Sequence, residues 1–374
     1  MLSTDKQTDY RFKLLYALGM IFIVAGHCKH GGVSLFYEWF PPYSFHLGLF
    51  AFSSGYFYKE ESESAILKYC TRKAKHLLLP LYVWNVFYAL LTMTLGKWGV
   101  TIGAGVTLNK LLIAPITDGH QFGFNLGGWF VVPLFMVQMF NVIIRKKFQS
   151  EASKYKEHLL FLLYLLLGIL GILLANRGYR TGWWLVLVRM LFFVPFYGAG
   201  IYYKKVLEKR DNSSNSAYFF TIIAIQLVII MVYKKTPAYR PSWCDNFTEG
   251  PFLPYIVGFL GIAFWLRIAR ILEPSIGKSR TVQLIADNTF SIMIHQFLGF
   301  MIVKMFFAML QNQTLFADFD INGFKTDIWY YYIPGGMSQM LIVYLFSGLF
   351  VPILIQRLID CIKCRFTGLR KTGN

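Results

Sequence analysis

The 374-residue sequence is poor in charge, in acidic residues and in cysteine, and each shortage excludes a class of protein. Charged residues make up 15% of the chain, against about 25% in a typical soluble domain. Five scattered cysteines are too few for a disulfide framework. The 56% apolar content excludes a disordered chain. Because the apolar residues fall in long runs, a soluble enzyme of several domains is also a poor description.

Ten mostly apolar stretches are each long enough, at about 17 to 25 residues, to cross the hydrocarbon core of a bilayer as a helix. Irregular backbone cannot face lipid with its polar groups unpaired, so helices are the expected form. We predict an all-α polytopic membrane protein with about ten transmembrane helices in a single domain over residues 1–374. The predicted spans are 13–30, 42–58, 77–96, 127–144, 159–175, 184–203, 217–233, 252–269, 290–310 and 336–356.

The basic residues predict the orientation of these spans. If the N-terminus is cytoplasmic, 26 of the 37 Lys and Arg residues lie in the cytoplasmic segments, and this bias favours both termini inside. The net charge of +18 is then a signal of topology and of affinity for anionic membrane lipids, rather than of nucleic-acid binding. The segments counted as cytoplasmic are the N-terminus, 59–75, 145–156, 204–210, 267–280 and the tail from Arg357.

Almost none of the 19 acidic residues falls inside a predicted span. A proton-coupled transporter generally needs a carboxylate within the membrane, and a glycosidase-type hydrolase needs two carboxylates close together. The sequence fits neither pattern. We also predict no metal site, because the seven histidines lack clustered carboxylates and the pair Cys361 and Cys364 lacks two further ligands.

Histidine and arginine are the ionisable residues that remain within or at the ends of the spans. His27 ends the first span, where it suits a general base, although a solvated histidine at a helix end is the simpler alternative. His46 near the outer end of the second span can orient His27 or the acceptor, or simply lie at the interface. Arg189 lies inside the sixth span, where an unpaired guanidinium is costly. His295 is a further candidate for the same polar cavity.

Several motifs resemble the acyltransferase-3 family of integral membrane O-acyltransferases, and the sugar O-acetylase branch in particular. The first helix from Lys13 to His27 is similar to the family's opening helix, and Phe45–Tyr56 (FHLGLFAFSSGY) is similar to its F-H-x-x-L-F-x-F-x-S-G-Y pattern. A basic stretch followed by L-L-L-P-L-Y at 77–82 also resembles the family. Weaker similarity lies at Gly128–Val131, Arg189–Gly200 and Ser291–His295.

The resemblance implies that His27 is the catalytic base, with His46 and Arg189 as further catalytic candidates. The family normally has a basic residue eleven positions before this histidine, but the present chain has Tyr16 there. Eleven residues return to nearly the same helical face, about 16 Å away along the axis. Lys13 lies within about 40° of that face and is a substitute. The departure predicts either a different donor-binding geometry or a lost activity.

The resemblance further implies an acyl-CoA donor, with acetyl-CoA the expected one, and a hydroxyl acceptor on a saccharide or lipid-linked saccharide of the cell envelope. Candidate donor-binding residues are Lys13, Ser54, Gly55, Arg72 and Lys73, although the positive-inside rule also accounts for the last two. The expected location is the bacterial plasma membrane. The alternatives are a small-molecule transporter on the same helices and an inactive relative that acts as an interaction partner.

The orientation can be tested by accessibility of single cysteines. Cysteines at positions 150, 210 and 280 should resist an impermeant thiol reagent added to sealed cells, because these positions lie in the predicted cytoplasmic segments. A cysteine near position 245 should react. Reaction at the first three positions would contradict the predicted orientation.

Overall fold

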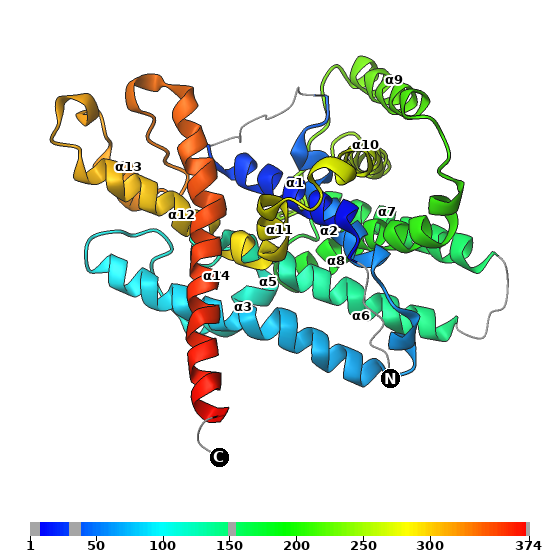
Figure 1. Cartoon of the computed structure of the whole chain (residues 1–374), viewed down its shortest axis with the longest axis horizontal. Coiled ribbons are helices and arrows are strands. Elements are labelled where there is room, and N and C mark those ends of the chain that lie inside the picture. Colours follow the sequence, from blue (N-terminus) through cyan, green and yellow to red (C-terminus); the bar gives the residue numbers. More distant parts are fainter. Residues whose placement is uncertain (1–7, 30–38, 149–154, 372–374) are drawn as a thin grey trace.

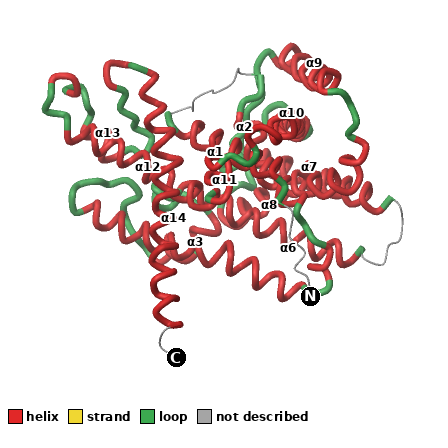
Figure 2. Tube along the Cα trace, in the orientation of Figure 1, coloured by secondary structure: helices red, strands yellow, loops and turns green. Residues whose placement is uncertain are grey.

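The computed structural model describes residues 8–29, 39–148 and 155–371, and in these ranges the chain is helical without a single strand (Figures 1 and 2). The one β-type pairing among them is an isolated bridge between Arg240 and Asp245. The all-α prediction is therefore confirmed. Residue 30 of the first predicted span and position 150 in the third basic segment lie outside the described residues.

Every predicted span corresponds to a long helix. Within the described residues, eight helical segments are long and apolar enough to cross a membrane, and the 18-residue α1 and 15-residue α2 are not among them. A multi-pass membrane protein is thus supported, while the number of ten crossings stays a prediction. The helices are α1 (Tyr10–His27), α2 (Pro42–Tyr56), α3 (Ile66–Gly96), α6 (Val131–Lys147), α7 (Lys156–Asn176), α8 (Gly182–Tyr202), α9 (Asn215–Tyr233), α10 (Leu253–Ile276), α12 (Thr289–Met309) and α14 (Leu341–Lys371).

Shorter helices connect them, and the apolar runs did not indicate these. A 3₁₀ turn, η2 (Leu126–Phe130), leads directly into α6. A π-helical turn, η3 (Tyr203–Leu207), extends α8. The remaining short α-helices are α4 (Leu108–Leu112), α5 (Ala114–Thr117), α11 (Arg280–Asp287) and α13 (Ile321–Thr326).

Helix α1 lies at the centre of the bundle and contacts α2, α10, α11, α12 and α14. It begins where the Asp9 carboxylate accepts a hydrogen bond from the Arg11 backbone N–H, which caps one of the unpaired N–H groups of the first turn. Eleven of its 18 residues are buried. This burial on nearly all sides explains why the sequence of α1 shows little amphipathic periodicity.

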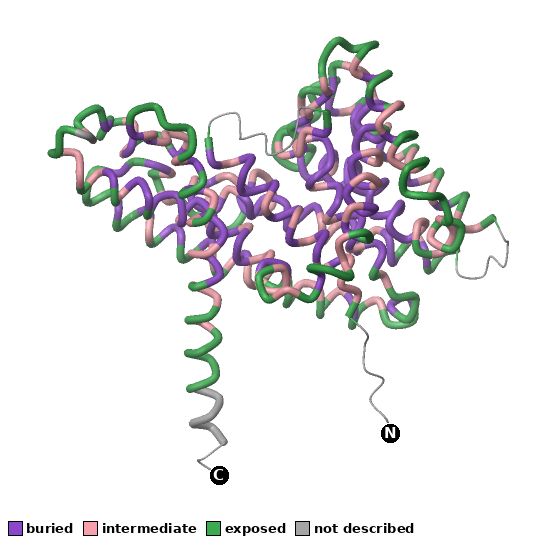
Figure 3. The backbone as a smooth tube through the Cα atoms, turned by 45° about the horizontal axis from the view of Figure 1, so that its top comes forward, coloured by how far each residue is buried: buried purple, intermediate pink, exposed green. Residues whose placement is uncertain are grey.

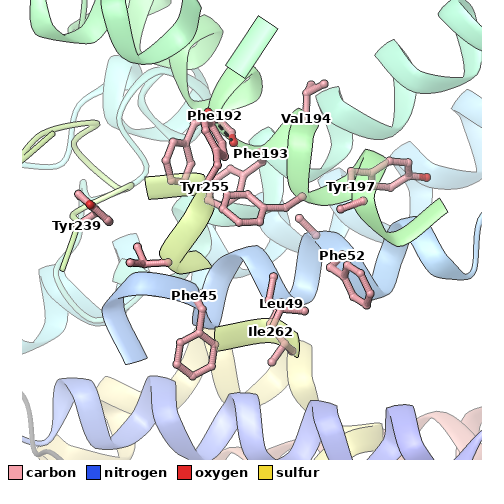
Figure 4. Close-up of a cluster of buried hydrophobic side chains, with 14 of the residues drawn as sticks. Phe45, Leu49, Phe52, Phe192, Phe193, Val194, Tyr197, Tyr239, Tyr255 and Ile262 are labelled. Carbon is pink, nitrogen blue, oxygen red and sulfur yellow. Dashed lines mark hydrogen bonds between the residues drawn. The ribbon is translucent and has the colours of Figure 1, made fainter. Parts of the chain in front are cut away.

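Helices α2 and α8 are packed backbone to backbone. A Cβ atom on Gly55 would lie 1.9 Å from the carbonyl oxygen of Tyr197, and one on Gly200 would lie 1.9 Å from that of Phe52. Large aromatic residues from α2, α8 and α10 fill the space beside this contact (Figure 4). Small residues thus permit the close approach, as they do at many helix contacts in membranes.

Ion pairs join several of the basic segments at one end of the bundle. The Arg145 guanidinium, which is 1% exposed, lies 2.7 Å from Glu157 and 3.3 Å from Glu63. Lys205 lies 2.6 Å from the same Glu157. These contacts unite three of the segments that the charge count assigned to one side of the membrane. The C-terminal half of α14 projects beyond the buried body of the bundle (Figure 3).

The Gly55 contact can be tested by a one-carbon change. Gly55→Ala should lower the thermal unfolding temperature in detergent, because α2 and α8 must separate to admit the methyl group, at a cost of about 1–3 kcal/mol for overpacking. Gly96→Ala is the matched control, since a Cβ there meets nothing within 4 Å. Equal unfolding temperatures for the two variants would show that the contact adapts without strain.

Candidate functional site

Two cavities meet at α1, and His27 lines the larger one. This His27 cavity has a volume of about 340 Å³. Its walls come from the ends of α1 and α2, from η2, from α12, and from three connecting segments near residues 120, 242 and 329. The lining residues are Ile23, His27, Tyr43, His46, Leu47, His120, Leu126, Gly127, Trp129, Phe130, Arg240, Pro241, Ser242, Trp243, Met293 and Trp329.

The second cavity, of about 220 Å³, is lined by Tyr16 and is called the Tyr16 cavity. It shares the lining residues Ile23, Phe130 and Met293 with the His27 cavity, so the two are adjacent. Along α1, the lining residues are Tyr16, Met20, Ile23 and His27. Their spacing of four, three and four places them on one helical face. The sequence prediction that residues 16 and 27 face the same side is therefore confirmed.

Every carbonyl of the last turn of α1 has a hydrogen-bond donor, and this holds the helix end that carries His27. The last carbonyls of a helix have no partner within the helix. Here the Cys28 thiol and backbone N–H donate to the carbonyls of Val24 and Ala25. The Tyr43 hydroxyl donates to the carbonyl of Gly26 at 2.7 Å, and the Tyr331 hydroxyl donates to that of His27.

The His27 ring is oriented by Gln296 of α12. Nδ1 of His27 lies 3.0 Å from Oε1 of Gln296, whose own Nε2 donates to the Met293 carbonyl at 3.2 Å. Because an amide oxygen only accepts, this arrangement assigns the proton to Nδ1. Nε2 is then the basic nitrogen of His27. Gln296 is fully buried, so little freedom remains in the pair.

His46 lines the same cavity as His27, so the structure brings these two sequence-predicted residues together. Its Nδ1 donates to the carbonyl of Pro42 one turn earlier in α2. The ring also meets Tyr43 edge-on at 5.3 Å between centroids. With Nδ1 occupied, His46 likewise has Nε2 as its remaining nitrogen.

Arg189 lies behind the cavity wall and is not among the residues that line it. Its guanidinium donates to the carbonyl of Ser242 and, at 2.9 Å, to that of Asp118. It also lies over the ring of Trp129, 4.9 Å from the centroid. Arg189 therefore binds α8 to two connecting segments that help enclose the cavity. Its charge is balanced by backbone dipoles and an aromatic face.

His120 and Trp243 form a stacked pair in those segments, with ring centroids 4.5 Å apart and planes inclined by 13°. Burial lowers the pKa of His120, and the Asp118 carboxylate 3.1 Å from its Nδ1 acts in the opposite direction. Burial alone raises the pKa of Asp118, but its contact with His120 outweighs this and the pKa is lowered. At neutral pH the stacked rings of His120 and Trp243 therefore give the cavity an uncharged aromatic surface.

A buried lysine holds the segment that carries Trp329. Nζ of Lys304 in α12 is fully buried, donates to the carbonyl of Ile328 at 2.6 Å, and lies 4.5 Å from the ring centroid of Tyr331. Tyr331 in turn reaches the His27 carbonyl, and the ring of Trp329 lies 5.9 Å from that of His27. A chain of contacts therefore connects Lys304 to the end of α1.

The predicted donor-binding residues lie in different places. Ser54 lines the Tyr16 cavity and accepts a hydrogen bond from Gln138 at 3.0 Å. Gly55 packs against Tyr197, and Lys13 forms an ion pair with Asp287. Neither of these two is among the residues that line the Tyr16 cavity.

Arg72 lines a basic hollow on the first turns of α3, together with Lys68, Thr71, Lys75 and His76. Arg72 and Lys73 both lie over the ring of Tyr69, at 5.7 Å and 5.5 Å from its centroid. The next residue of α3 after this hollow, Leu77, lines the Tyr16 cavity. One helix therefore extends from the basic hollow to the cavity wall.

The contacts of Gln296, Tyr331, Lys304, His120 and Trp243 were not predicted from the sequence. Sequence reasoning selected His295, whereas its neighbour Gln296 reaches His27. The His295 ring lies against α3 instead, with Nδ1 2.7 Å from the Tyr88 hydroxyl. Neighbouring residues of a helix point about 100° apart, so a motif alone does not identify which of them enters a cavity.

The fold and the site define a multi-pass membrane protein with a histidine in a partly apolar cavity at the end of its central helix. A family model described as an acyltransferase domain, that of acyltransferase-3, matches residues 9–357. The chain belongs to this family, and the family indicates a membrane acyltransferase. No curated protein and no solved structure matches the chain.

Proposed function

We propose that the protein transfers an acyl group, with acetyl the expected one, from acyl-CoA to a hydroxyl of a saccharide or other cell-envelope acceptor. The observation that carries this proposal is the His27–Gln296 pair beside the junction of two cavities. One cavity can admit a donor and the other an acceptor, so that both reach the same imidazole. The bacterial plasma membrane is the proposed location.

The donor is proposed to approach through the Tyr16 cavity. The part of its lining that the structure describes has no charged side chain, and its polar groups are the hydroxyls of Tyr16, Ser54 and Thr289. Such a lining suits the uncharged pantetheine arm better than the phosphates of CoA. The phosphates would remain at the basic hollow around Arg72, where guanidinium and ammonium groups can bind them.

The acceptor is proposed to bind in the His27 cavity among its aromatic residues. Trp129, Trp243, Trp329 and Tyr43 all line it. Their flat faces can pack against the C–H faces of a sugar ring, while ring N–H and hydroxyl groups bind its oxygens. Among the described residues that line this cavity, Arg240 is the one with a permanent charge, and it is paired with Asp245 at 2.9 Å.

In the proposed reaction, Nε2 of His27 removes the proton from the acceptor hydroxyl as its oxygen attacks the thioester carbonyl. The tetrahedral intermediate then collapses, the C–S bond breaks, and the CoA sulfur takes the proton back from the imidazolium. The products are the O-acyl ester and free CoA. Bringing the two substrates together at the junction of the two cavities contributes proximity, and the imidazole contributes general-base catalysis.

The oxyanion of this intermediate needs hydrogen-bond donors. The first N–H groups of a helix have no partner within it, and Leu126 and Gly127 at the start of the η2–α6 segment both line the His27 cavity. We propose these backbone groups as donors. Arg189, with its guanidinium bound to the Ser242 and Asp118 carbonyls, then supports the enclosing segments.

Replacing His27 is the direct test of this function. His27→Ala should insert and unfold like the wild type yet lose at least about a hundredfold in acyl transfer from labelled acyl-CoA, the typical loss for a general base. His158→Ala, at an exposed position on α7, is the matched control and should retain activity. If His27→Ala keeps activity within a few-fold of wild type, His27 is not the general base. Uptake of substrate into liposomes without covalent transfer would favour a transporter.

The orienting role of Gln296 can be tested separately from the role of His27, through kcat and its dependence on pH. Gln296→Leu should lower kcat about 10- to 100-fold, by analogy with partners that orient metal-bound histidines, with little change in KM for acyl-CoA. Gln296→Glu should restore most of kcat and move the acid limb of the kcat–pH profile to higher pH, because a carboxylate stabilises the imidazolium. Gln226→Leu controls for loss of a buried glutamine that lines neither cavity. An unchanged kcat in Gln296→Leu would mean that the ring needs no such partner.

A further inference from the structure

A third cavity, of about 450 Å³, lies beside α9 and shares no lining residue with the His27 and Tyr16 cavities. We call it the α9 cavity. Its body is apolar and aromatic, and its lining residues come from α2, α7, α8 with its π-helical extension, α9 and α10. Phe52, Phe161, Leu207, Phe259, Ile262 and Leu266 supply most of the apolar surface.

Helix α9 forms the outer edge of this part of the bundle (Figure 1). Only three of its 19 residues, Ile222, Gln226 and Ile229, are buried. Many of its large apolar side chains, such as Phe220, Val228 and Met231, are exposed. In a membrane protein these exposed side chains face lipid, so the α9 cavity lies at the lipid-facing edge of the bundle.

One end of the α9 cavity is cationic. Arg210 and Asp211 line it, and the Asp211 carboxylate already accepts from Arg267 and, at 3.2 Å, from Arg270. Two guanidinium groups therefore share one carboxylate, and Arg210 adds a third positive charge to the lining. Within the described ranges, no acidic side chain forms an ion pair with Arg210, and Arg270 is 46% exposed. This end has an excess of positive charge without an internal partner.

We propose that the α9 cavity binds an anionic glycerophospholipid, with an acyl chain in the apolar body and the phosphate at Arg210 and Arg270. An apolar body with a cationic end complements an amphiphile with an anionic head. Arginine binds phosphate oxygens through several N–H groups at once, and basic pockets between transmembrane helices are suited to anionic headgroups. The volume lies within the range of about 300–1,000 Å³ typical of ligand sites.

A bound lipid would join α9 to the rest of the bundle. The cavity is bounded by Tyr218 of α9 on one side and by Phe161, Tyr202 and Phe259 of α7, α8 and α10 on the others. An acyl chain between them buries apolar surface that α9 leaves open, and this burial is favourable. The inference does not depend on the acyl-transfer reaction, because the α9 cavity is separate from the two cavities at His27.

The test uses the full-length protein, delipidated in detergent and titrated with phosphatidylglycerol or phosphatidylcholine. Native mass spectrometry counts the retained lipids, and intrinsic fluorescence gives the unfolding temperature. Phosphatidylglycerol should be retained and should raise the unfolding temperature more than phosphatidylcholine does. The double variant Arg210→Gln/Arg270→Gln should bind phosphatidylglycerol at least about tenfold more weakly, because two headgroup contacts are lost.

Two further variants separate this site from general attraction to negative lipid. Ala263→Phe keeps all charges but places a ring in the cavity, and it should also lose phosphatidylglycerol retention. Lys146→Gln/Lys147→Gln removes two exposed charges from the last turn of α6, away from the cavity, and should bind as the wild type. Equal retention by all variants, equal binding of both lipids, or binding of CoA in place of phosphatidylglycerol would each overturn the proposal.

Discussion

The end of α1 is the feature on which the rest of the site depends. A helix that ends inside a protein leaves carbonyl groups without partners, and in an apolar setting each unpaired group is costly. Here the donors come from Cys28, from Tyr43 of α2 and from Tyr331 near the start of α14. Satisfying the backbone therefore brings α2 and the segment before α14 to the same place as His27. The requirement to pair backbone carbonyls thus also builds the cavity around the imidazole.

The two adjoining cavities differ in the ionisable groups that line them. The boundary between them consists of Ile23, Phe130 and Met293, which are apolar, while the imidazoles of His27 and His46 lie on one side and the phenol of Tyr16 on the other. In the proposed reaction, the thioester carbonyl of the donor would lie at this apolar boundary, beside the imidazole of His27. Tyr16 stands in the family's basic position, and the described residues that line its cavity carry no charge. Under the proposed function, recognition of the CoA phosphates falls to the basic residues of α3.

Much of the helical architecture could be predicted from apolar runs, and part of the site from helical spacing. The common face of Tyr16 and His27 follows from the 3.6-residue period, and His46 reached the same cavity from a motif on a different helix. Gln296, Tyr331 and His120 could not be found in this way, because they belong to segments far from His27 in the chain. Tyr331 and His120 lie in connections that have no strong periodic pattern, and Gln296 lies in α12, whose apolar sequence does not indicate which side chain reaches His27. The 18-residue α1 and the 15-residue α2 are largely buried against other helices, so their sequences need not be as long or as apolar as those of helices that contact lipid.

The scarcity of acidic residues in the spans has a structural counterpart in how the buried cations are paired. Arg189 and Lys304 are almost fully buried, and both donate to backbone carbonyls, those of Ser242 and Asp118 for the arginine and that of Ile328 for the lysine. Each also lies against an aromatic ring, Trp129 or Tyr331. A carboxylate partner would only neutralise the buried positive charge. A backbone carbonyl partner also fixes the connecting segment to which the carbonyl belongs. These segments enclose the His27 cavity, so Arg189 and Lys304 support the cavity by fixing the backbone of its walls. Neither cation then serves as a proton acceptor, and His27 remains the residue suited to proton transfer.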